Sequence, residues 1–164
     1  MLLNFPVSTL YSQLKHESSW DGIVRTIELD NGEVKFYHFS NINSTLSIYN
    51  FDNSIWKTIK LPLTKSHRLD EIKLISMSIF NKDTLAEVLY TCTSNSISGF
   101  AEELVETTSY TLNLIDETGK VLFKEPDCNN LKFVDSKGTK KLLIYKNSGV
   151  GIKAKVHTVV YALP

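Results

Sequence analysis

Short runs of alternating apolar and polar residues, separated by turn residues, make up most of this chain. In the first half these runs lie at residues 23–29, 34–39, 45–51 and 55–61. Asn31 and Gly32 separate the first pair, and Asp52 to Ser54 separate the second pair. Asn-Gly between two strand-like runs is one of the strongest local hairpin signals. The pattern therefore predicts two successive antiparallel hairpins.

The second half of the chain follows the same pattern. Its strand-like runs lie at residues 85–93, 110–115, 120–124, 131–134, 140–145 and 156–163. Pro126 closes one hairpin as Pro62 closes an earlier one, because proline cannot donate to a strand ladder. Helical periodicity is confined to two short candidates, Ser8 to Glu17 and Ser98 to Glu106.

A weak internal repeat connects the two halves. Residues 47–62 and 112–126 share an order of apolar strand, acidic turn, aromatic-bearing strand and proline. A strand that ends in tyrosine, at Tyr37 or Tyr90, precedes each copy, and Tyr145 ends a third such strand. The repeated unit is thus about four antiparallel strands, present two to three times.

These elements predict an all-β fold of antiparallel meander or hairpin repeats with very little helix, arranged like propeller blades or as a sandwich. The chain is too short for the four or more blades that close a ring, so we expect an open stack of sheets, a sandwich or a partly closed barrel. We assign residues 1–19 to an N-terminal segment and residues 20–164 to a single all-β domain, a size that buries a sizeable core.

Charge and hydropathy narrow the classes of partner. Eighteen basic and eighteen acidic residues cancel, and a neutral chain lacks the long-range field that attracts nucleic acid. No apolar run approaches the roughly 20 residues of a membrane-spanning helix, so we expect no membrane insertion. We see no signal peptide. The chain is then cytoplasmic or part of a virion, unless it is a processed fragment of a secreted or cell-surface protein.

Residues suited to catalysis or to metal binding do not form a recognisable motif. The four histidines, His16, His38, His67 and His157, are scattered, and no Gly-x-Ser-x-Gly elbow is present. We therefore predict no enzymatic activity, no catalytic residue, no cofactor and no metal.

The acidic residues and the cysteines also have ordinary interpretations. The carboxylates do not have the spacing of a calcium loop, and we expect them in solvated loops; this group is Asp83, Glu87, Glu102, Glu103 and Glu106. Cys92 and Cys128 form no CxxC pair, and the sequence leaves open whether they are bonded to each other.

Aromatic residues and the C-terminal run point to recognition of another molecule. Aromatic rows on sheets bind sugars, peptides or partner sheets, although we expect Trp56 in the core. Residues 157–163 carry no charge except the titratable His157, so as an edge strand they would be poorly protected. We predict an interaction surface that includes Trp20, Val159 and Tyr161, for another subunit or the next domain of an assembly. Lysine at Val159 and Tyr161 should weaken that association, provided that both side chains face outward.

Several segments resemble a β-rich region of secreted Bacteroidetes surface proteins. The resemblance rests on residues 52–59, 80–83 with 87–90, 115–122, 138–142 and 160–164, and it covers roughly Phe36 to Pro164. In that family the region precedes a C-terminal type IX secretion sorting domain. The resemblance implies a fold and a secreted or surface location, and it carries no catalytic residues.

Three hypotheses on function follow. The first is a non-enzymatic interaction or accessory domain of a secreted or surface assembly. The second is a structural component of a larger particle, such as a phage virion. The third is a protein that binds a small ligand or a carbohydrate in a pocket with convergent polar groups.

Overall fold

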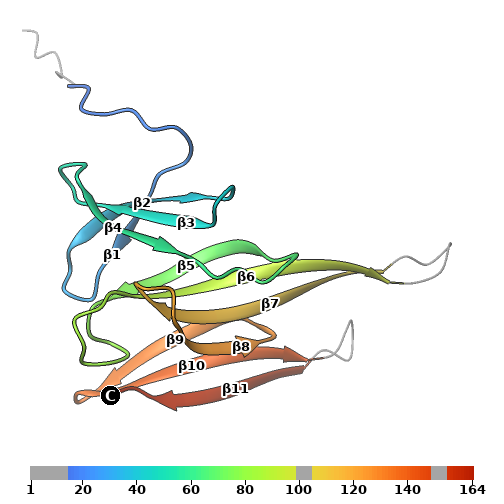
Figure 1. Ribbon diagram of the computed structural model, residues 1–164. Helices are drawn as coiled ribbons and strands as arrows, with labels where there is room; N and C mark the ends of the chain where they lie inside the picture. The colour runs from blue at the N-terminus through green and yellow to red at the C-terminus, as the bar shows by residue number, and fades with distance from the viewer. Residues whose placement is uncertain (1–14, 99–104, 149–154) are drawn as a thin grey trace, which may run out of the picture.

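The protein is a stack of three antiparallel sheets (Figure 1). The computed structural model describes residues 15–98, 105–148 and 155–164. Strands account for 63% of the structure, and the described residues contain no helix. The strands are β1 (Arg25–Glu28), β2 (Val34–Ser40), β3 (Thr45–Tyr49), β4 (Ile55–Lys60), β5 (Arg68–Ser76), β6 (Glu87–Ser98), β7 (Val105–Asp116), β8 (Val121–Pro126), β9 (Cys128–Ser136), β10 (Thr139–Ser148) and β11 (Lys155–Ala162).

Each sheet is a meander whose strands follow one another in chain order. The first sheet contains β1 to β4, the middle sheet β5 to β8, and the third sheet β9 to β11. All neighbouring strands are antiparallel. The predicted all-β fold of antiparallel meanders is confirmed.

The same tight turn joins strands at three places, at residues 29–33, 50–54 and 116–120. In each turn the first amide donates to the fifth carbonyl, and the fourth amide donates back to the first carbonyl, at 2.8 to 3.0 Å. The fourth residue has a positive φ, and it is Gly32, Asn53 or Gly119. Glycine and asparagine tolerate this left-handed conformation, which explains the turn residues at these places.

The middle sheet is buried on both faces. Successive residues of β6 point to opposite faces: Val88 and Tyr90 enter a core shared with the first sheet, and Leu89 enters a core shared with the third sheet. We call these the first core and the second core. In the part of the chain that the structure describes, the first core has twelve buried residues and the second core has six.

Three details of the sequence prediction need correction. Strand β5 was not predicted, because register shifts at Leu69/Glu71 and Ile72/Leu74 break its alternation of apolar and polar residues. The described ends of the predicted helix Ser98 to Glu106 are strand instead, with Ser98 opposite Val105 in the β6–β7 ladder. Most of the other helix candidate lies outside the described residues, and residues 15–17 have no regular structure.

The two cysteines lie in different cores, on opposite sides of the middle sheet. Cys92 belongs to the first core and Cys128 to the second, and both are free thiols. Burial raises the pKa of Cys92 to about 11 and also raises the pKa of Cys128. Both are buried apolar residues in this structure.

Candidate interaction groove between the middle and third sheets

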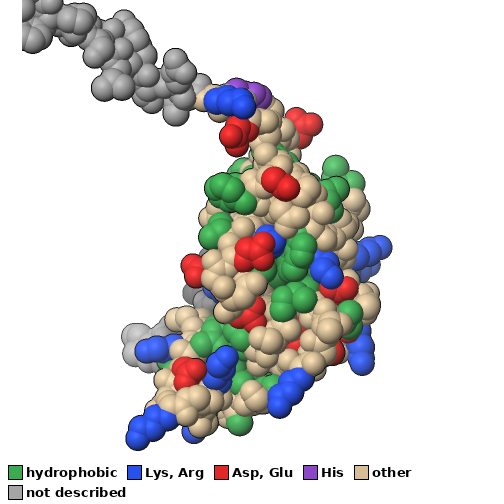
Figure 2. Space-filling model, turned by 90° about the vertical axis from the view of Figure 1, so that its left-hand side faces the viewer, with side chains coloured by type: hydrophobic (Ala, Val, Ile, Leu, Met, Phe, Trp, Pro, Cys, Tyr) green, Lys and Arg blue, Asp and Glu red, His purple; other side chains and the backbone are tan. Residues whose placement is uncertain are grey.

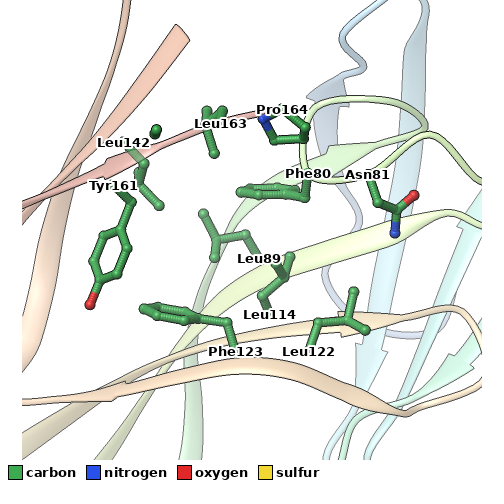
Figure 3. A pocket seen from close by; sticks show the side chains of 11 residues that line it. Phe80, Asn81, Leu89, Leu114, Leu122, Phe123, Leu142, Tyr161, Leu163 and Pro164 are labelled. Carbon is green, nitrogen blue, oxygen red and sulfur yellow. The ribbon is translucent and has the colours of Figure 1, made fainter.

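A largely apolar cavity of about 300 Å³ lies between the middle and third sheets (Figure 3). We call it the groove. Its walls come from β6, β7, β8, β10, the β5–β6 loop and the C-terminal segment. The lining residues are Phe80, Asn81, Leu89, Leu114, Leu122, Phe123, Leu142, Tyr161, Ala162, Leu163 and Pro164.

Two strand edges border the groove. Strand β8 is the last strand of the middle sheet, and β11 is the outermost strand of the third sheet. Among the described residues, each pairs with a neighbour on one side only. Phe123 of β8 and Tyr161 of β11 meet edge to face, with ring centroids 5.1 Å apart. The groove therefore lies where unpaired backbone and apolar side chains come together.

A polar cluster around Glu125 fastens the two sheets beside the groove. The Tyr161 hydroxyl donates to Glu125 Oε2 at 2.9 Å, and the Lys146 ammonium pairs with Glu125 Oε1. The hydrogen bond from Lys146, and secondarily the one from Tyr161, lowers the pKa of Glu125 despite partial desolvation. The bond to Glu125 in turn raises the pKa of Tyr161. This cluster orients the Tyr161 ring against Phe123.

The loop between β5 and β6 forms another wall of the groove. It carries Phe80, whose ring meets Phe133 of the third sheet with centroids 6.0 Å apart. Asp30, from the first sheet's β1–β2 turn, holds the start of this loop by accepting hydrogen bonds from Ser76 Oγ at 2.9 Å and Ser78 Oγ at 2.8 Å. The loop thus connects all three sheets.

Glu87 is buried at the end of this loop. Its side chain is fully buried, and neither carboxylate oxygen has a hydrogen bond of normal geometry within the described part of the chain. Desolvation raises the pKa of Glu87 to about 7; nearby backbone amides oppose this rise, and the charges of Asp83 and Asp30 add to it. The prediction that Glu87 lies in a solvated loop is wrong, because it occupies the first position of a strand buried on both faces.

The structure separates the three residues predicted as an interaction surface. Trp20 packs edge to face on Tyr49 of the first sheet, with centroids 4.4 Å apart, whereas Val159 and Tyr161 belong to β11 of the third sheet. Val159 lies opposite buried Ile144, and Tyr161 lies opposite buried Leu142. Directly paired residues share a face of the sheet, so both side chains point toward the middle sheet. The outward orientation that a lysine test at these two positions requires is therefore not met.

Most groove residues were missed by the sequence interpretation. Leu122, Phe123 and Leu142 lie in segments that were predicted as strands. Hydrophobic alternation assigns a residue to a face of its own sheet, but it does not say which other sheet that face will meet. Trp56, which we expected in the core, does pack against the first core, and Lys35 lies over its ring at 4.9 Å.

Metal binding and membrane spanning find no support in the described residues. No three His, Cys, Asp or Glu side chains among them are grouped to hold a metal ion. Nor does this part of the chain contain a helix with the length and hydropathy needed to cross a membrane. No protein-family model, curated protein or solved structure matches the chain.

Proposed function

We propose that this chain is a non-enzymatic interaction domain that binds another protein of an assembly through the groove. One observation carries the proposal: an apolar cavity of about 300 Å³ opens between two strand edges, each unpaired on one side among the described residues. Exposed strand edges pair readily with other chains, and apolar pockets beside them accept side chains.

The same groove offers less to a small polar ligand. Sites for such ligands combine an apolar wall with several convergent polar groups. Here the lining side chains with polar groups are Asn81 and Tyr161, and the Tyr161 hydroxyl is already bonded to Glu125. A carbohydrate or metabolite would therefore find few partners. The resemblance to secreted surface proteins suggests that the assembly is a surface one, with a phage particle as the alternative.

Site-specific photo-crosslinking tests this function. A benzoylphenylalanine at Leu122 or at Leu163 lies in the groove, whereas one at Val121 lies on an exposed neighbouring site that does not line it. We expect the same protein partner to be captured from both groove positions and not from Val121. Excess unlabelled protein should compete with capture, and excess Leu122→Asn protein should not. Equal capture from Val121, or no capture from either groove position, would contradict the proposal.

A further inference from the structure

The third sheet is one strand narrower than its neighbours. The first and middle sheets each contain four strands, and within the described residues the third contains three. A fourth strand would fit beside β11, because β11 is the outermost strand and follows β10 as β7 follows β6. A strand added there would give all three sheets the same width.

The fourth strands of the other two sheets show what such a strand does. In the first sheet, β4 contributes the buried Ile59 and the partly buried Trp56 to the first core. In the middle sheet, β8 contributes Phe123 to the second core. Each fourth strand thus directs apolar side chains into an interface between sheets. The groove lies next to the position where the corresponding side chains of the third sheet would be.

The chemistry of the site indicates a polypeptide as occupant. The free side of β11 presents backbone N–H and C=O groups at strand spacing, and a second extended backbone satisfies them as a ladder. Side chains of an added strand alternate between two faces, so every second one would point toward the groove. These inward side chains must be apolar, because the groove is lined mainly by leucine, phenylalanine and proline.

The positive charge of the third sheet favours a strand from another protein over a second copy of this chain. Residues 128–164 contain seven lysines and a single acidic residue, Asp135. Five of these lysines are exposed, and basic side chains project from the lower end of the molecule, where the third sheet lies (Figure 2). Those five are Lys132, Lys137, Lys140, Lys141 and Lys155. Pairing β11 of two copies would bring two such basic sheets together, which like-charge repulsion opposes.

The geometry points to strand addition at β11: an extended segment of a partner protein, apolar at alternate positions and flanked by acidic residues, supplies the fourth strand of the third sheet. This inference rests on the proposed function and names the class of partner. Backbone pairing supplies affinity, the groove selects the apolar side chains, and the lysines attract the acidic flanks.

Synthetic peptides test this inference on the full-length protein. The probe is a blocked peptide, Asp-Glu-Ile-Thr-Phe-Thr-Val-Thr-Glu-Asp, together with its reversed sequence, so that both strand directions are covered. We expect one of the two to bind, measured by calorimetry. Methylation of its alternate backbone nitrogens should weaken binding by about tenfold or more, because methylation removes ladder hydrogen bonds. Replacing the acidic flanks with lysine should weaken it by a similar factor.

Two neighbouring substitutions serve as matched variants. Leu122→Asn should reduce peptide affinity by about tenfold, because it places an amide in the apolar groove. Val121→Asn, on an exposed side chain outside the groove, should leave affinity unchanged. Both positions are partly exposed, at 38% for Leu122 and 48% for Val121, so both variants are expected to fold.

Several outcomes would overturn strand addition. One is failure of both peptides to bind, or equal binding by the methylated peptide. Another is a dimer in analytical ultracentrifugation that Leu122→Asn dissociates, which would identify a second copy as the occupant. A third is that oligothymidylate binds more tightly than either peptide and that Leu122→Asn leaves this binding unchanged. The lysines would then bind a polyanion rather than the acidic flanks of a peptide. If groove crosslinks form while both peptides fail, the interaction function stands and strand addition alone is wrong.

Discussion

The two interfaces between sheets are built alike at their polar margins but differ in their cores. At the first, Lys57 pairs with Glu117 of the middle sheet at 2.5 Å, and at the second, Lys146 pairs with Glu125 of the same sheet. Among the described residues, the first interface encloses twelve buried residues and has a cavity of about 470 Å³ with charged side chains in its lining, whereas the second encloses six and has a largely apolar cavity of about 300 Å³. The two interfaces thus differ in the size of their cores and in whether the cavity beside the core is lined by charged or by apolar side chains.

The number of strands accounts for this difference. Within the described residues, four strands of the first sheet cover the middle sheet, and three strands of the third sheet cover its other face. A sheet that lacks a strand leaves apolar surface of its neighbour uncovered, which costs about 25 cal/mol for each Å². The second interface is therefore where an apolar partner gains most by binding, and the first interface, with the larger core, is where the chain gains most of its own stability.

The largest expected effect compares one leucine from each core. Leu46 is fully buried in the first core, and Leu142 is buried in the second but lines the groove. Leu46→Ala should lower the free energy of unfolding by about 4 kcal/mol, and Leu142→Ala by about 2 kcal/mol, because Leu142 already lacks neighbours on one side. Urea unfolding measures both free energies. If Leu142→Ala loses as much stability as Leu46→Ala, or more, the two cores do not differ in the way described.

The second prediction concerns pH and Glu87. Its pKa is raised from 4.5 to about 7 in the folded protein, so the folded state retains a proton that the unfolded chain releases between these values. The contribution of Glu87 to stability is therefore fully present below pH 4.5, falls as pH rises to about 7, and is level above. Glu87→Gln should remove this dependence and stabilise the protein at pH 8 by about 1 to 2 kcal/mol, less than the full pKa shift implies, because the buried amide of Gln also lacks hydrogen-bond partners.

A surface variant controls for the change in net charge. Glu28→Gln removes a carboxylate that is exposed on β1. The difference in unfolding free energy between Glu87→Gln and the parent should be small at pH 4 and large at pH 8, whereas Glu28→Gln should track the parent at both. A Glu87→Gln protein that loses stability at pH 8 would show that the carboxylate is charged and satisfied in the fold.

The third prediction tests the polar cluster that fastens the second interface. Tyr161→Phe keeps the ring against Phe123 and removes the hydroxyl that donates to Glu125. Because this hydrogen bond has a charged acceptor, its loss should cost about 1 kcal/mol, after a reduction for partial exposure. Chemical unfolding gives the value. No measurable loss at pH 7 would mean that water replaces the hydroxyl at Glu125 at no cost.

The smallest expected effect is a gain in stability. Leu122→Phe adds apolar volume to the groove and should raise stability by about 0.5 to 1 kcal/mol. Val121→Phe, outside the groove, should leave the thermal midpoint close to that of the parent. Destabilisation by Leu122→Phe, compared with no change for Val121→Phe, would indicate that the groove is already filled in solution.

Local signals in the sequence predicted the fold class and most of the strands. The turns at Gly32 and Gly119 and the Lys137-Gly138 turn require positive φ, and these residue types mark the hairpins without any tertiary information. Strand β5 was missed because its two register shifts destroy the alternation on which the prediction depends.

The groove could not be predicted in the same way. Whether Tyr161 points inward depends on its pairing with Leu142, twenty residues or so earlier, and on which sheet covers that face. The burial of Glu87 likewise depends on both faces of the middle sheet being covered, which no local pattern encodes. An edge strand near the C-terminus was predictable, whereas the cavity beside it required the stacking of sheets.

Hydrogen exchange resolved by residue tests the central claim, that β11 is the open edge at which a strand is added. Strands β4 and β8 are also outermost strands of their sheets and serve as internal references. On saturation with the acidic-flanked peptide, alternate amides of β11 should become protected, while amides of β4 and β8 keep their rates. Unchanged exchange in β11 with bound peptide, or protection that appears in β8 or β4 instead, would contradict the account.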